Sequence, residues 1–261
     1  MRALSIAATG MLAQSTNVEV IANNLANMNT TGYKMQRASF VDLLYQNVAV
    51  PGTQSSDAGT IVASGIQLGV GVRTQSVYRI TTQGDLSSTS NDYDMAISGK
   101  GYFSILMPDG TDAYTRDGNF TLSSAGLLVT QDGYTVQPGI TFPTGASDPT
   151  VSTTGLVQAT VNGTVQTVGQ MQLTRFANDA GLKSLGDNLL QETDSSGAPQ
   201  TSTPGTTGYG NIKQKYLETS NVDSTTEITA MITAQRAYEM NAKVVTAADS
   251  MLSTVANMGG S

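Results

Sequence analysis

The 261-residue chain contains no cysteine, no histidine and no tryptophan. The absence of cysteine and histidine excludes thiol nucleophiles, Ser-His and Cys-His dyads, and nearly all structural zinc sites. Charged residues are also scarce, at 13% of the chain, against about 25% in an ordinary soluble domain. Serine, threonine, asparagine, glutamine and glycine must therefore supply most of the polar surface. A chain that is largely covered by neighbouring proteins would have the same composition.

Basic residues are fewer than acidic ones, 13 against 20, which gives a net charge of −7. The sequence has no basic stripe, and this argues against binding to nucleic acid through phosphate contacts. No apolar run approaches the roughly 18 residues of a membrane helix. The first residues, MRALSIAATGMLAQS, are mildly apolar, but Ser5, Thr9 and Gly10 interrupt them. Because the helical pattern continues beyond them, we expect no cleaved signal peptide.

Apolar residues recur every seven positions near both ends of the chain, which is typical of helices with a narrow coiled-coil seam. Residues 29–32 predict the end of the first helix, where Gly32 suits the left-handed residue that follows a helix. Asp223, Ser224 and Glu227 predict the start of the second helix. The residues expected on the two seams, and expected to mediate self-assembly, are Leu4, Met11, Val18, Ile21, Leu25, Met28, Ile228, Met231, Tyr238, Val245 and Leu252.

The polar face of the first helix carries almost no charge. Up to Gly32, its only charged side chains are Arg2 and Glu19. A coiled coil that faces solvent usually carries lysine and glutamate at its flanking positions. Uncharged amides and hydroxyls can instead be buried against other protein when they find hydrogen-bond partners. This pattern favours helices that are covered on assembly, while a helical hairpin packed on the chain's own sheet stays open as an alternative.

Short runs of strand-forming residues fill the middle of the chain, and glycine turns such as Asp109-Gly110, Asp117-Gly118 and Asp132-Gly133 separate them. Asn162-Gly163, between two alternating arms, predicts a type I′ hairpin. The expected fold is therefore α+β, with a discontinuous domain of two terminal heptad helices forming a coiled coil and a central antiparallel all-β module. The expected parts are the helix of residues 1–32, an extended segment at 33–71, the β-rich domain at 72–219 and the helix of residues 220–261. Residues 46–71 and 193–210 are expected to be linkers or extended excursions.

Several enzyme motifs are approached but not completed. Gly99-Lys100-Gly101 lacks the serine or threonine that completes a phosphate loop. The aspartates of residues 109–117 lack the ligand spacing and closing glutamate of a calcium loop, and turns explain them. Asp92 and Asp94 could form a glycosidase pair, but two exposed acids in a turn are common. We expect no catalytic residue, no cofactor and no metal site, and a protein that is not an enzyme.

Asparagine is concentrated where the first helix is expected to end. Asn23, Asn24 and Asn27 lie within five residues, although asparagine is unfavourable inside helices. Two interpretations stay open. These residues belong to a fraying helix end, where asparagine favours turns, or their amides pair across subunits and fix register, as a buried asparagine does in coiled coils.

Several segments resemble the axial proteins of the bacterial flagellum, the family of rod and hook proteins. The resemblance is carried by NNLANMNTTGYK, ETSNVD and MITAQRAYEMNAKVV, and also by ISGKGYFSI and YTRDGNFTLSSAGLLVTQDGY in the middle. DLLYQ, PGTQSSDAG and SGIQLGVGVR, within residues 42–73, resemble the long extension of the distal-rod branch of this family. The residues that match the family motifs are Asn23, Asn24, Leu25, Ala26, Asn27, Thr30, Gly32, Tyr33, Lys34, Ser220, Asn221 and Val222.

The resemblance implies a structural subunit that stacks helically into a stiff hollow tube in the flagellar basal body, crossing the periplasm and carrying torque from motor to hook. It implies contacts with copies of the chain, proximal rod proteins, hook-side axial proteins and the surrounding peptidoglycan and outer-membrane bushing rings. It also implies export by the flagellar type III machinery. Two other classes stay open: an adhesin module, which has no need of matched terminal heptads, and a secreted hydrolase, which would need a carboxylate cleft.

Overall fold

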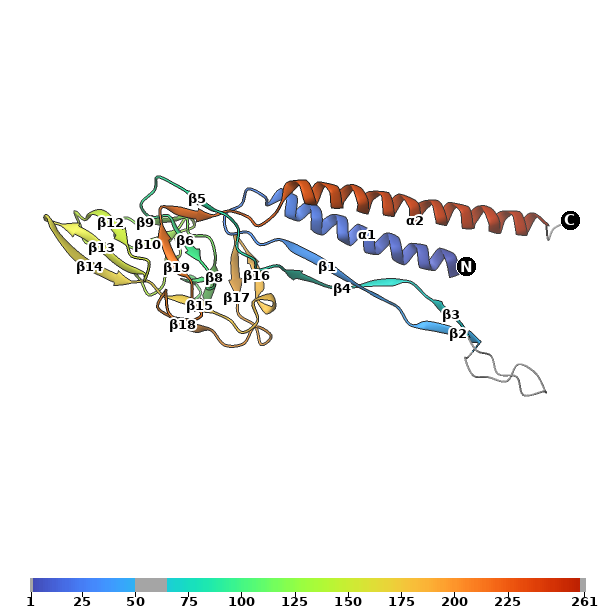
Figure 1. Cartoon of the computed structure of the whole chain (residues 1–261), viewed down its shortest axis with the longest axis horizontal. Coiled ribbons are helices and arrows are strands. Elements are labelled where there is room, and N and C mark those ends of the chain that lie inside the picture. Colours follow the sequence, from blue (N-terminus) through green and yellow to red (C-terminus); the bar gives the residue numbers. More distant parts are fainter. Residues whose placement is uncertain (1, 50–64, 259–261) are drawn as a thin grey trace. The chain divides into compact units, whose positions relative to one another are not determined.

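The computed structural model of the chain describes residues 2–49 and 65–258 and divides into two compact units (Figure 1). The helix unit comprises Met1–Leu25, Gln36–Tyr78 and Ser224–Ser261, and the β unit comprises Ala26–Met35 and Arg79–Asp223. Two terminal helices and a central antiparallel β region confirm the predicted α+β class.

The helix unit is built from two helices and two narrow pairs of strands. Strand β2 pairs antiparallel with β3, and β1 pairs with β4. Part of the predicted linker at residues 46–71 therefore forms strands, and residues 50–64 of it lie outside the described residues. The elements are α1 (Arg2–Ala26), β1 (Gln36–Asp42), β2 (Tyr45–Ala49), β3 (Ile66–Gly69), β4 (Val72–Arg79) and α2 (Ser224–Met258).

Helix α2 begins at Ser224, as its capping residues predict, but α1 ends at Ala26, before the predicted stop. The helix thus ends earlier than predicted, while the left-handed conformation predicted for Gly32 is confirmed. Gly32 has φ +66°, and a Cβ on it would lie 2.7 Å from the backbone nitrogen of Asp117. Its backbone N–H also donates to the carbonyl oxygen of Glu218 at 2.8 Å. The glycine is required where three distant segments of the β unit meet, since only glycine fits both the φ and the close approach.

The β unit contains a seven-stranded antiparallel sheet in the order β16-β17-β8-β7-β11-β10-β9 and a three-stranded sheet in the order β12-β13-β14. The pairs β15-β18, β6-β19 and β5-β20 complete it. Its elements are β5 (Leu86–Ser88), β6 (Met95–Ser98), β7 (Phe103–Leu106), β8 (Asp112–Thr115), β9 (Phe120–Leu122), β10 (Leu128–Thr130), β11 (Thr135–Val136), β12 (Ser147–Val151), β13 (Leu156–Val161), β14 (Thr164–Gln170), β15 (Leu173–Arg175), a 3-10 helix (Asp179–Gly181), β16 (Lys183–Gly186), β17 (Leu189–Gln191), β18 (Gln200–Ser202), β19 (Asn211–Gln214) and β20 (Tyr216–Glu218).

Most of the predicted hairpin turns are confirmed. Asn162 and Gly163 both have positive φ, +50° and +78°, and they join β13 to β14 as a type I′ turn requires. Asp109-Gly110 joins β7 to β8, and Asp132-Gly133 joins β10 to β11. Asp117-Gly118 is not a hairpin, because β8 and β9 do not pair. A Cβ on Gly118 would overlap the carbonyl oxygen of Met95, so this glycine serves a close approach to β6 instead.

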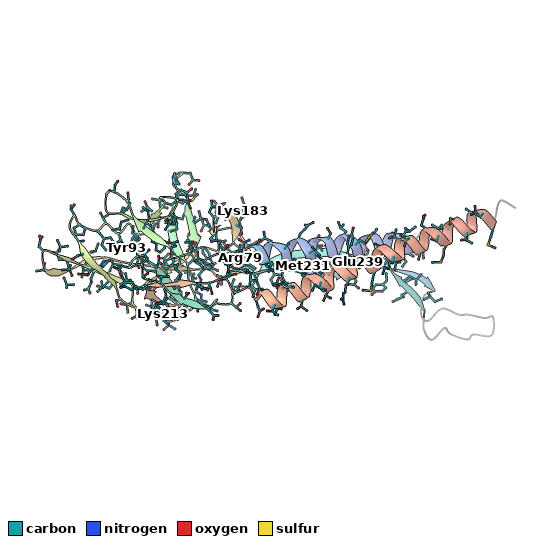
Figure 2. All side chains as sticks on the ribbon, turned by 90° about the horizontal axis from the view of Figure 1, so that it is seen from above. Arg79, Tyr93, Lys183, Lys213, Met231 and Glu239 are labelled. Carbon is teal, nitrogen blue, oxygen red and sulfur yellow. The ribbon has the colours of Figure 1, made fainter. Side chains whose placement is uncertain are left out.

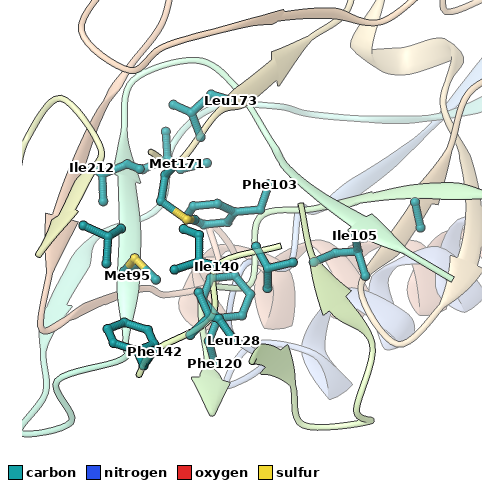
Figure 3. Close-up of a cluster of buried hydrophobic side chains, with 14 of the residues drawn as sticks. Met95, Phe103, Ile105, Phe120, Leu128, Ile140, Phe142, Met171, Leu173 and Ile212 are labelled. Carbon is teal, nitrogen blue, oxygen red and sulfur yellow. The ribbon is translucent and has the colours of Figure 1, made fainter. Parts of the chain in front are cut away.

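The core of the β unit is a cluster of buried apolar side chains contributed by most of its strands (Figure 3). Phe103 and Phe120 are fully buried in an edge-to-face contact, with ring centroids 5.1 Å apart. The predicted linker at residues 193–210 includes β18, which pairs with β15 beside this cluster. The β unit therefore has a hydrophobic core of its own, which includes no residue of α1 or α2.

Candidate functional site

The two helices of the helix unit run antiparallel and contact each other through small and polar residues. Asn24 Nδ2 donates to Glu227 Oε2 at 3.0 Å, and a Cβ on Gly10 would lie 2.9 Å from Asn241 Nδ2. Glu227, Ala234 and Ala248, seven residues apart or multiples of seven, are the buried residues of α2. The inner face of α2 therefore has a seven-residue repeat, but small and polar side chains occupy it.

The predicted apolar seams lie beside this contact, and a coiled coil built on them is not established. Among the predicted self-assembly residues, Ile21 is buried, and Met28, Ile228, Tyr238 and Leu252 are exposed. The half-buried ones are Leu4, Met11, Val18, Leu25, Met231 and Val245.

Large apolar side chains stand exposed along α2. Figure 2 shows the side chains along this helix, where Met231 and Glu239 are labelled. Exposed apolar side chains in this number along one helix are typical of a surface that contacts other protein. None of the helices within residues 2–49 and 65–258 is long and apolar enough to cross a membrane. The exposed apolar residues of α2, called the α2 row below, are Ile228, Ile232, Tyr238, Met240, Val244, Met251, Leu252, Val255 and Met258.

Asn24, in α1, binds two other segments of the helix unit, at Gln36 and at Glu227. Its side chain is 1% exposed. Its Oδ1 accepts from the backbone N–H of Gln36, and its Nδ2 donates to the carbonyl oxygen of Gln36, both at 2.8 Å. With the bond to Glu227, these contacts use the amide inside the subunit. Pairing of the asparagine cluster across subunits stays a prediction.

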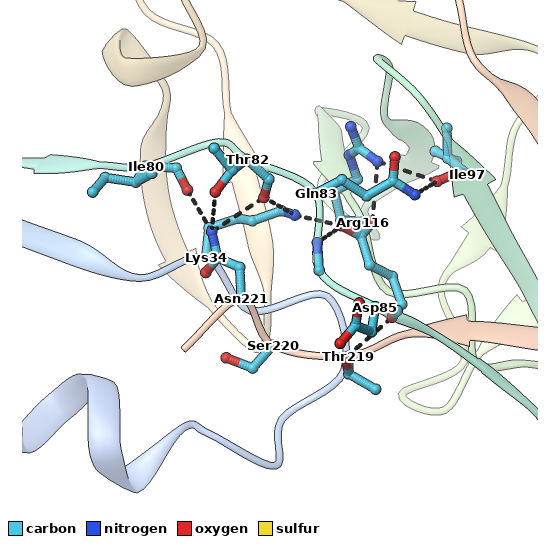
Figure 4. A network of polar contacts seen from close by, with 12 residues as sticks. Lys34, Ile80, Thr82, Gln83, Asp85, Ile97, Arg116, Thr219, Ser220 and Asn221 are labelled. Atoms are coloured by element: carbon cyan, nitrogen blue, oxygen red, sulfur yellow. Dashed lines mark hydrogen bonds and ion pairs between the residues drawn. The ribbon is translucent and has the colours of Figure 1, made fainter. Parts of the chain in front are cut away.

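A buried ion cluster lies in the β unit, where the first and last segments of that unit meet (Figure 4). Glu218 pairs through Oε1 with Lys34 Nζ and through Oε2 with Arg116 Nη1, the latter at 3.0 Å. The backbone N–H of Gly84 donates to the same carboxylate at 3.0 Å. The side chains of Lys34, Arg116 and Glu218 are 5%, 7% and 0% exposed. Burial lowers the pKa of Lys34, and the attraction of Glu218 offsets this in part.

Asn221, near the ion cluster, forms hydrogen bonds to two other segments of the β unit (Figure 4). Its Oδ1 accepts from the backbone N–H of Met35 at 2.7 Å. Its Nδ2 lies 3.0 Å from the carbonyl oxygen of Ile80 and 3.1 Å from that of Thr82. The backbone N–H of Ile80 also donates to the carbonyl oxygen of Met35 at 2.9 Å. Asn221 thus binds two segments that are also hydrogen-bonded to each other.

The residues that match the family motifs lie in both units. Lys34 and Gly32 are buried, and Asn24 is buried in α1. Sequence reasoning missed the cluster in which Glu218 pairs with both Lys34 and Arg116. The signal that could have found it was the rarity of charged residues in this chain. Asn23 and Ala26 are exposed, and the half-buried members are Leu25, Asn27, Thr30, Tyr33, Ser220, Asn221 and Val222.

Two buried tyrosines of the β unit give a measurable dependence on pH. Burial raises the pKa of both Tyr102 and Tyr114 to about 12, against about 10 for a free tyrosine. Their rings contact Phe176, and the Arg116 guanidinium lies 5.5 Å from the Tyr102 ring centroid.

We expect stability to fall as pH rises from about 10 to about 12, because unfolded tyrosines lose a proton there while Tyr102 and Tyr114 keep theirs. Ultraviolet titration of tyrosinate should show two of the ten tyrosines ionising last. Tyr114→Phe should remove one late step, whereas Tyr45→Phe, at an exposed position, should leave both. A single transition for all ten in the folded protein would contradict this.

The carboxylates considered as catalytic candidates have other partners. Asp92 pairs with Lys215 at 2.6 Å on the surface, as expected of an exposed acid. Asp94 was also expected to be exposed, but it is buried and accepts from Asn91 Nδ2 at 2.8 Å. Asp109 accepts from the backbone and hydroxyl of Thr111 within a turn. In the described part of the chain, no group of three or more acidic side chains is placed to hold a metal ion.

Three family models match the sequence. They are described as "Flagella basal body rod protein" over residues 4–34, "Flagellar hook protein FlgE/F/G D1 domain" over residues 96–159, and "Flagellar basal body rod FlgEFG protein C-terminal" over residues 213–258. The two terminal matches cover the helices with their buried motif residues, and the central match lies within the β unit.

Curated relatives match over nearly the whole chain. The chain is 55% identical to flagellar basal-body rod protein FlgG of Caulobacter vibrioides, covering 99% of both chains. It is 53% identical to FlgG of Agrobacterium fabrum over 98% of both, and 39% identical to FlgG of Bacillus subtilis over 99% of both. Among solved structures, the hook protein FlgE2 of Helicobacter pylori matches 71% of this chain and 43% of its own at 17% identity, with a TM-score of 0.23. The resemblance found in the sequence is thus confirmed, and the chain belongs to the family of flagellar basal-body rod proteins, which are structural proteins and not enzymes.

Proposed function

We propose that the chain, a structural subunit of the flagellar basal-body rod, builds the distal part of the rod. Many copies would stack helically into a stiff hollow shaft that transmits torque from motor to hook and encloses the export channel. The observation that carries this proposal is the α2 row. These apolar side chains are exposed to water along the whole of α2. Because the chain belongs to a self-assembling family, we infer that a second copy of the chain covers them.

The composition of the helices supports burial by copies of the chain. Residues 2–26 carry only Arg2 and Glu19 as charged side chains, so neighbours can cover this helix with little desolvation of charge. In the proposal, α1 and α2 of neighbouring subunits pack into coaxial layers through Leu4, Met11, Val18 and the α2 row. Single pairs of such helices are marginal in water, so assembly would order them and premature polymerisation would be avoided.

The remaining partners belong to the same proposal. The β unit carries 14 acidic against 8 basic residues, a net charge of −6 out of the −7 of the chain. We place the β unit on the outside of the shaft, where its net negative charge would reduce sticking to the peptidoglycan and outer-membrane bushing rings. Residues 42–73 would bridge to adjacent subunits and stiffen the shaft. Proximal rod proteins and hook-side axial proteins would adjoin its ends.

The proposal also covers domains and export. It keeps the expected division into residues 1–32, 33–71, 72–219 and 220–261, with the helices of the first and last parts, α1 and α2, forming the inner tube. It has the chain cross the periplasm as part of the rod after export by the flagellar type III apparatus.

Electron microscopy of purified protein tests the proposal. We expect the full-length chain to form hollow tubes when concentrated. A chain limited to residues 26–223 should keep the circular dichroism and cooperative melting of the β unit and form no tubes, because it lacks both helices. Tubes from the helix-free form, or a full-length chain that stays monomeric at every concentration reached, would contradict the proposal.

A further inference from the structure

The chain passes four times between the helix unit and the β unit, after residues 25, 35, 78 and 223. In the proposed shaft, these four covalent connections carry torque from one unit to the other. We propose that Asn24 and Asn221 are positioning residues that bind the connecting segments into two fixed groups and thereby set the torsional stiffness of the connection. This inference rests on the proposed function for its purpose, although its geometry does not depend on assembly.

On the helix side, Asn24 holds three of the four connections. It lies one residue before the first connection, and its partner Gln36 is the first residue after the second. Its other partner, Glu227, lies in the first turn of α2, just after the fourth connection. Because the amide of Asn24 is 1% exposed, water does not compete for these hydrogen bonds.

On the β side, Asn221 also holds three connections. Its partner Met35 is the last residue before the second connection, and its partner Ile80 is the second residue after the third. Asn221 itself lies two residues before the fourth connection. The second and fourth connections are therefore fixed on both sides, and the second is fixed at adjacent residues, Met35 and Gln36.

An asparagine amide suits this task because one planar group both donates and accepts hydrogen bonds. A single extended segment can twist about φ and ψ at every residue. Segments whose backbones are bound to each other cannot turn independently, so torsion is shared among them. Loss of either amide should loosen the connection while the β unit, whose core lies elsewhere, stays folded.

The absence of cysteine allows a direct measurement on the full-length chain. Ser76→Cys in the helix unit and Ser124→Cys in the β unit, both at exposed positions, would carry spin labels for double electron–electron resonance. We expect the distance distribution to widen at least two-fold in Asn24→Ala and Asn221→Ala. The matched controls Asn23→Ala and Asn211→Ala, which change exposed asparagines, should keep the original width.

Unchanged widths in both Asn24→Ala and Asn221→Ala, whatever their melting temperatures, would overturn the inference. Should Asn221→Ala fail to fold, Asn221→Asp decides, since it keeps the acceptor for Met35 and loses the donors to Ile80 and Thr82. A width between that of the wild type and a two-fold increase would support the inference, and a wild-type width would overturn it. The measurement uses dilute, unassembled protein, so the absence of tubes would count against the proposed function and not against the clamps.

Discussion

Replacing Glu218 by glutamine should lower the free energy of unfolding of the β unit by about 3–5 kcal/mol. The substitution leaves Lys34 and Arg116 as two buried positive charges, 5% and 7% exposed, without a counter-ion. It also weakens the acceptor for the N–H of Gly84. Urea denaturation followed by far-ultraviolet circular dichroism measures the change, and the midpoint should fall with little change in the slope.

The matched control is the exposed pair of Asp92 and Lys215, whose side chains are 42% and 54% exposed. Asp92→Asn should cost at most about 1 kcal/mol, because water already screens that pair. Lys34→Met gives a second comparison, since it leaves Glu218 and Arg116 as a balanced pair and should destabilise less than Glu218→Gln. If Asp92→Asn and Glu218→Gln lower the free energy of unfolding equally, the buried cluster stabilises the β unit no more than an exposed ion pair does.

The helices could be predicted from sequence because their signal is local. The seven-residue spacing of Leu4, Met11, Val18 and Leu25 located α1, but the spacing alone does not say which side of a helix meets its partner. In the structure, Gly10 permits the close approach to Asn241, and the larger apolar residues lie to the side or outside. A pattern of apolar residues could not distinguish contact within a subunit from contact that awaits other subunits.

The same division holds in the β unit. Asn162-Gly163 predicted its hairpin because turn chemistry depends on neighbouring residues. The ion cluster was not predicted, since Lys34 and Glu218 are 184 residues apart and Arg116 and Glu218 are 102 apart. Asp117-Gly118 was misassigned for a related reason. Its glycine is required by Met95 of another strand, and the local sequence cannot show that contact.

Introducing aspartate at both Leu252 and Val255 should abolish tube growth while leaving the subunit folded. These side chains are 40% and 66% exposed in the isolated chain, so their replacement removes little from the subunit itself. If neighbouring subunits bury them, each loses about 1.5–3 kcal/mol of apolar burial and places a carboxylate in the contact. The concentration needed for assembly should rise about 100-fold or more, as measured by sedimentation and electron microscopy.

Ser253→Asp/Thr254→Asp is the matched control, because it adds the same two charges in the same turn of α2 at exposed polar positions. It should shift the assembly concentration far less, since no apolar contact is lost and a charge that stays in water costs little. Circular dichroism must show equal helix content in all three proteins, so that a change in assembly reports on contacts between copies. Tubes that form equally well from Leu252→Asp/Val255→Asp protein would mean that the α2 row faces the channel or solvent, and that neighbouring subunits meet through another surface.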